Sequence, residues 1–125
     1  MERNNFAEQK GFRNLQTWQK AYDLALHIYK TVKYFPDQEE YVLCSQIRRA
    51  SISVIANIAE GYERQTPKEF ARFLRMAKGS LGEIETYLLF SKDLGYIKSE
   101  LYDILENKRQ DTSKLLRGLI NYLHK

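Results

Sequence analysis

The chain has 125 residues, 43% of them hydrophobic, and a formal net charge of +4. This length suits one domain with one core, and the absence of any apolar run of 18 residues argues against a transmembrane helix. Cys44 is the single cysteine and cannot form an internal disulfide, so we expect a cytoplasmic protein.

Residues 1–13 are polar, carry charges of both signs and lack the apolar stretch of a secretory signal. We expect them to form a flexible N-terminal arm ahead of one four-helix bundle domain at residues 14–125. The first helix is predicted at residues 14–35 and ends before Pro36. Its apolar residues recur at steps of three and four, the period of one helix face: Leu15, Trp18, Tyr22, Ala25, Ile28 or Tyr29, and Val32.

A second helix is predicted at residues 38–62. Asp37 offers an N-cap, and Glu40, three positions later, completes a capping-box pattern. One apolar stripe follows the helical period and is predicted to face the core: Leu43, Ile47, Ala50, Val54, Ile58 and Gly61.

The third helix has the clearest start signal in the chain. Thr66 can cap it, Pro67 fits its first position, and Glu69 lies three residues after the cap. Gly95 is predicted to end it in the left-handed conformation. Its core positions are Phe70, Phe73, Ala77, Leu81, Ile84 and Leu88.

A fourth helix is predicted from about Ser99, although its middle at residues 107–113 is polar. Its core positions are Leu101, Leu105, Leu115 or Leu116, Leu119 and Leu123. Helices of similar length joined by short breaks predict an all-α, antiparallel, up-down-up-down four-helix bundle.

The second helix also carries a second apolar stripe, formed by Ile52, Ile55, Ala59 and Tyr62. A surface helix needs only one apolar face. Two interpretations remain open: either both neighbouring helices bury this stripe, or it is an interface between subunits. The second interpretation predicts a homo-oligomer.

Positive charge is concentrated in residues 64–78, which contain five cations and one carboxylate. Lys68, Arg72 and Arg75 fall within about 60° of one another on the third helix. This row is either an ordinary solvated face or a phosphate-binding surface that reads the nucleic-acid backbone with little sequence preference. The candidate nucleic-acid-binding residues are Arg48, Arg49, Arg64, Lys68, Arg72, Arg75 and Lys78.

Patterns typical of enzymes are not found. The two histidines, His27 and His124, lie in no metal-binding arrangement, so no metal and no cofactor are predicted. Gly79 and Gly82 fall inside the third helix, so they do not form a phosphate-binding loop. Small residues inside a helix more often serve close packing. We therefore expect no catalytic residues and no enzymatic activity.

Several local motifs together are specific for one family. They are Gln46-Ile47-Arg48-Arg49-Ala50, Asn57-Ile58-Ala59-Glu60-Gly61 and Gly79-Ser80-Leu81-Gly82-Glu83, preceded by Leu15-Gln16-Thr17-Trp18-Gln19-Lys20-Ala21. In these motifs the chain resembles the four-helix bundle proteins encoded by intervening sequences of bacterial 23S ribosomal RNA genes. The resemblance extends from about Phe12 to the C-terminus and is weakest in the fourth helix.

The resemblance implies a bacterial cytoplasmic bundle that assembles into a ring-like homopentamer. A related branch comprises accessory proteins of diversity-generating retroelements, which bind a reverse transcriptase and nucleic acid through a basic surface. In this chain Glu39, Glu40, Glu60 and Glu63 dilute the basic charge. We expect a non-enzymatic homo-oligomer that binds RNA or a ribonucleoprotein, with a scaffold for a partner protein such as a reverse transcriptase as the alternative.

Overall fold

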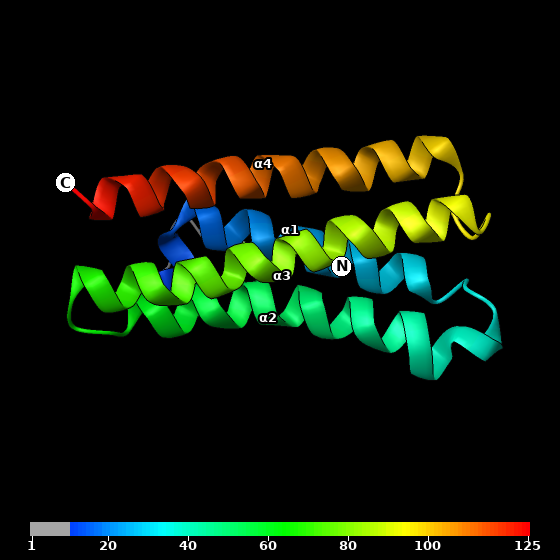
Figure 1. Ribbon diagram of the computed structural model, residues 1–125, viewed down its shortest axis with the longest axis horizontal. Coiled ribbons are helices and arrows are strands. Elements are labelled where there is room, and N and C mark those ends of the chain that lie inside the picture. Colours follow the sequence, from blue (N-terminus) through cyan, green and yellow to red (C-terminus); the bar gives the residue numbers. More distant parts are fainter. Residues whose placement is uncertain (1–10) are drawn as a thin grey trace.

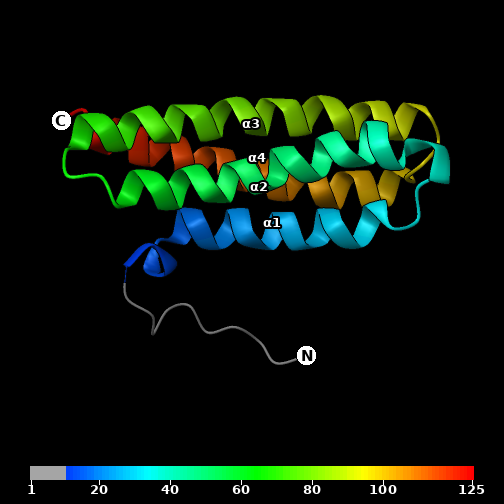
Figure 2. The same ribbon diagram turned by 90° about the horizontal axis from the view of Figure 1, so that it is seen from below.

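The computed structural model describes residues 11–125 as an antiparallel four-helix bundle, which confirms the predicted fold class (Figures 1 and 2). Each helix packs against the helices before and after it, and α1 also packs against α4, so the four form a square in chain order. The elements are η2 (Gly11–Asn14), α1 (Gln16–Val32), η3 (Asp37–Glu39), η4 (Glu40–Cys44), α2 (Ser45–Tyr62), α3 (Pro67–Asp93) and α4 (Ser99–Leu123).

The predicted signals at both ends of α3 are confirmed. The Oγ1 of Thr66 accepts a hydrogen bond of 3.1 Å from the backbone N–H of Glu69, and Pro67 occupies the first helical turn. Gly95 has a φ of +81°, the left-handed conformation that lets the chain turn toward α4. These two residues fix where α3 begins and ends.

The predicted capping box at Asp37 is wrong. Neither η3 nor α2 has a side-chain hydrogen bond at its N-cap, and the chain instead passes through a 3-10 turn and then a π-helix before α2 begins. The wider π turn brings two consecutive residues, Leu43 and Cys44, into the core. α1 also ends earlier than predicted, at Val32, and the following turn returns Phe35 to the core against Tyr96.

The core positions predicted for the second helix, which lie in η4 and α2, are all buried. Of the two alternatives in α4, Leu116 is fully buried and Leu115 is only partly buried. Gly61 lets α2 approach α3 closely: a Cβ at this position would lie 2.8 Å from the Cβ of Phe73. A 2.8 Å hydrogen bond from the hydroxyl of Ser80 in α3 to that of Ser53 in α2 also connects these two helices.

The polar middle of α4 does not interrupt the helix, and part of it faces inward: Arg109 and Thr112 are buried. Arg109 donates to Glu106 at 2.6 Å on the same helix and to Glu85 of α3 at 3.2 Å. Lys108 reaches Asp23 of α1 at 2.8 Å. Burial raises the pKa of Glu106, but hydrogen bonds from Arg109 and its neighbour outweigh burial and leave the pKa lowered. Ion pairs therefore attach α4 to both adjacent helices.

The predicted N-terminal arm lies mostly outside the described residues. Of its 13 positions, only Gly11, Phe12 and Arg13 are described, and they belong to η2. The Phe12 ring lies 5.3 Å from the ring of Trp18 and packs partly against the core. Within the described part of the chain, no helix is long and apolar enough to cross a membrane.

Candidate nucleic-acid interface

The basic row lies on the solvent face of α3. Lys68, Arg72, Arg75 and Lys78 are all exposed, as expected from steps of three and four along a helix whose opposite side is buried. Within residues 11–125, no carboxylate pairs with Lys68, Arg75 or Lys78. These three cations are therefore available to a negatively charged ligand.

Arg72 of this row and one further arginine, Arg64, both lie against the ring of the buried Phe73. The guanidinium carbons of Arg64 and Arg72 lie 4.7 and 4.6 Å from the centroid of Phe73. Arg64 also pairs with Glu60, and Arg72 pairs with Glu69 at 2.9 Å. The hydrogen bond from Arg72 lowers the pKa of Glu69. Exposed pairs of this kind contribute only about 0–1 kcal/mol, so a phosphate can compete for either arginine.

The remaining two candidates lie apart from the α3 row. Arg48 is half-buried and donates a 2.6 Å hydrogen bond to Glu40 at the start of the same helical segment. Arg49 approaches Glu83 of α3 at 3.9 Å, near the middle of the bundle. The structure therefore brings together five of the seven predicted residues, from Arg64 to Lys78, and leaves these two in separate ion pairs.

The sequence reasoning missed a second group of cations, on the C-terminal half of α4. Lys114, Arg117 and Lys125 are exposed, and within the described part of the chain none pairs with a carboxylate. The signal was present in the sequence, because residues 112–125 contain no Asp or Glu. Only the antiparallel packing of α4 on α3 shows that this stretch lies beside the α3 row.

The predicted oligomer stripe remains partly open to solvent. Ile52 and Tyr62 are 45% and 38% exposed, whereas Ile55 and Ala59 are half-buried against the core. The neighbouring helices of one chain thus cover part of this apolar stripe and leave the rest uncovered. The helix that carries the stripe, α2, packs between α1 and α3 (Figure 2).

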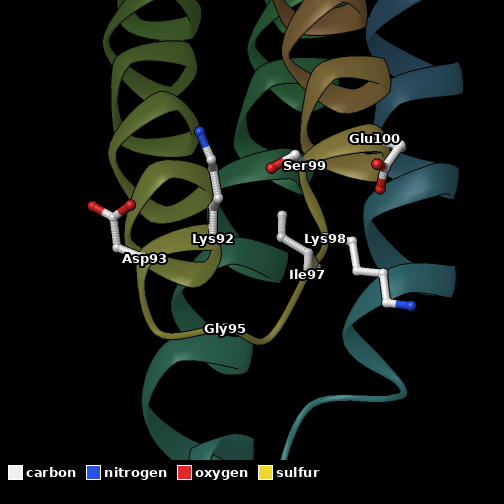
Figure 3. Close-up of a pocket in the computed structure, with 7 residues that line it drawn as sticks. All are labelled: Lys92, Asp93, Gly95, Ile97, Lys98, Ser99 and Glu100. Carbon is white, nitrogen blue, oxygen red and sulfur yellow. The ribbon is translucent and has the colours of Figure 1, made fainter.

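An open hollow at the α3–α4 connection does not have the character of a binding site. Its rim carries two lysines and two carboxylates, so its charges cancel. Figure 3 shows the ends of Asp93 and Lys98 pointing to opposite sides, with no group of polar atoms converging on one point. In residues 11–125 there is also no cluster of metal-ligating side chains, and burial raises the pKa of the Cys44 thiol.

Comparison with known families identifies the chain. The family model described as "23S rRNA-intervening sequence protein" matches residues 13–118. The chain belongs to this family. The match covers all of α1, α2 and α3 and most of α4, so it includes the whole basic row and the second cationic group except Lys125.

A solved relative has the same fold. It is a crystal structure at 1.70 Å of a protein with unknown function from the S23 ribosomal protein family of Bacteroides thetaiotaomicron VPI-5482. The two share 30% sequence identity with a TM-score of 0.78, over 83% of this chain and 97% of the relative. No curated protein matches the chain.

Proposed function

We propose that this chain is a non-enzymatic, homo-oligomeric bundle that binds RNA or a ribonucleoprotein through the basic face of α3. The observation that carries the proposal is the row of exposed cations on α3, three of which lack a carboxylate partner in the described chain. Such a row matches a string of phosphates, because its cations repeat along one side of a straight helix. The family's connection with 23S rRNA is consistent with an RNA ligand.

Binding of this kind is electrostatic and therefore depends on salt. Three to five phosphate contacts would give a slope of log affinity against log salt of about −2 to −4 on single strands. We expect the triple change of Lys68, Arg72 and Arg75 to glutamine to remove most of the affinity and flatten this slope. All three side chains are exposed, so the variant should keep its helical content.

Fluorescence anisotropy with labelled RNA, repeated over a salt series, measures both quantities. Circular dichroism checks that the variant is folded. The matched control is a triple change to glutamine at Lys20, Lys30 and Lys33, three exposed lysines in α1 and at its C-cap. Equal loss in both variants would mean that only net charge matters, and an unchanged slope in the α3 variant would refute the proposal.

The oligomer is proposed to form through the apolar stripe on α2. The exposed half of this stripe, Ile52 and Tyr62, is the part that a second copy would cover. Ile55 packs partly against the core of its own chain, so an Asp there would disturb folding as well as assembly. Ile52→Asp is the sharper test: we expect light scattering to show smaller particles while the helical content is retained. A pentamer is the assembly that the family resemblance implies.

A protein scaffold is the second candidate, supported by a different apolar surface. Val42 of η4, Phe90 of α3 and Leu94 at the C-cap of α3 are 61%, 55% and 44% exposed. All three lie at the end of the bundle away from the start of α3, where the basic row begins. If a partner protein binds there, Phe90→Ser should abolish binding of the partner and leave RNA binding unchanged.

A further inference from the structure

One hydrogen bond connects the end of α4 to the basic row. The Nη2 of Arg75 lies 2.5 Å from the Nε2 of His124, the residue at the C-cap of α4. Both side chains are exposed, and they meet because α3 and α4 pack side by side in opposite directions (Figures 1 and 2). His124 therefore touches a cation of the surface that is proposed to bind phosphates.

This contact defines the protonation state of His124 in the structure. An arginine guanidinium keeps its charge at any ordinary pH and can only donate hydrogen bonds. The Nε2 of His124 must therefore be the acceptor, so the ring is neutral and carries its hydrogen on Nδ1. A second proton, on Nε2, would remove the acceptor and place two cations in contact, so the two side chains would separate.

The charged groups around His124 are mainly cations. Five cationic side chains lie within two turns of the contact along α3 or α4 and, in residues 11–125, pair with no carboxylate: Lys68, Arg75, Lys78, Arg117 and Lys125. The carboxylates in this range are that of Glu69, which is bound by Arg72 at 2.9 Å, and the terminal one that follows His124 by one residue. The one carboxylate of α1, Asp23, is bound by Lys108, which precedes His124 by about four turns. A proton on His124 would thus add charge to mainly cationic surroundings.

A bound phosphate would reverse this repulsion. A protonated imidazole donates from both of its nitrogens, so charged His124 and Arg75 could each donate to one phosphate that lies between them. The position also suits a cation, because the backbone carbonyls at the C-terminal end of a helix carry partial negative charge. Histidine ordinarily changes its charge between about pH 5 and pH 8, so this exchange of partners falls within the physiological range.

We infer that His124 is a further phosphate-binding residue that acts only when it is protonated, holding one phosphate together with Arg75. This inference rests on the proposed function and adds to it a residue from a second helix and a dependence on pH. Because the phosphate favours the proton, the proton favours the phosphate by the same factor. Affinity for nucleic acid should therefore rise as the pH falls through the range in which histidine becomes charged.

The experiment measures binding of a short oligouridylate by fluorescence anisotropy over a salt series, at about pH 8 and at about pH 5.5. Uridine has no group that titrates between these values, so a change in affinity reports on the protein. We expect affinity at the lower pH to be about fivefold higher near 0.1 M salt, and the salt slope to be steeper by about 0.7, the effect of one more phosphate contact on a single strand.

Two substitutions fix the charge of position 124 in opposite states. His124→Gln keeps an acceptor for Arg75 but cannot take up a proton, so its affinity at both pH values should equal that of the unaltered protein at the higher pH. His124→Lys carries a permanent charge, so its affinity at both pH values should equal that of the unaltered protein at the lower pH. His27→Gln is the matched control: it removes the only other histidine, which lies beside Asp23 on α1, and should keep the full response. Circular dichroism at both pH values checks that each variant is folded.

Different failures lead to different conclusions. If the unaltered protein binds no oligouridylate at low salt and either pH, or if the triple change at Lys68, Arg72 and Arg75 leaves binding unchanged, the proposed function fails and the role of His124 fails with it. If that triple change weakens binding but acidification does not strengthen it, or strengthens it equally in His124→Gln, the role of His124 alone is refuted. A response that disappears in His27→Gln would also refute it, because the proton would then act on α1.

Discussion

Gly61→Ala should destabilise the bundle even though alanine is the better helix former. The new Cβ would lie 2.8 Å from the Cβ of Phe73 and 2.9 Å from the Cδ1 of Phe70, closer than carbon atoms pack. The Phe73 Cβ is fixed to the α3 backbone, so relief requires α2 and α3 to separate by several tenths of an ångström. Overpacking of this kind costs about 1–3 kcal/mol, against a gain of about 0.5–1 kcal/mol in helix propensity.

We therefore expect a net loss of about 1–2 kcal/mol in the free energy of unfolding. Urea denaturation followed by circular dichroism, at one fixed protein concentration, measures it as a lower midpoint with an unchanged slope. Gly82→Ala is the control of opposite sign, because its Cβ meets no atom within 4 Å and it should stabilise by about 0.5–1 kcal/mol. If the Gly61→Ala protein is at least as stable as the unaltered chain, the close approach of α2 to α3 does not require glycine at position 61.

Three further changes test the fold. Thr66→Ala removes the N-cap of α3 and should cost about 1 kcal/mol by urea denaturation, whereas Thr66→Asp should retain most of it. Leu81→Ala should cost about 2–5 kcal/mol, because Leu81 is 1% exposed and its loss leaves a cavity. The lowered pKa of Glu106 means that its stabilisation is complete above its unfolded pKa and is lost as pH falls through its folded pKa. Glu106→Gln should therefore lower stability at neutral pH and reduce the loss on acidification below about pH 4.5, and equal acid sensitivity in both proteins would contradict this.

Local signals in the sequence predicted most of the fold. The cap at Thr66, the left-handed Gly95 and the apolar period of α2 depend on a few neighbouring residues, so they could be identified without tertiary structure. The signal at Asp37 was equally local but failed, because the need to bury both Leu43 and Cys44 winds that segment into a π-helix. A local pattern is overridden where core packing demands a different backbone.

The sequence by itself determined that α3 has a basic row, since four cations at steps of three and four must lie along one side of a helix. Only the tertiary structure decided which cations act together. It separated Arg48 and Arg49 into their own ion pairs and brought Arg117 beside the α3 row, 39 residues after Lys78 in the chain. It also distinguished Gly61, which α3 crowds, from Gly79 and Gly82, which face open space. The physical reason is that helical period fixes neighbours within one helix, whereas the contacts between helices depend on packing that no short window of sequence contains.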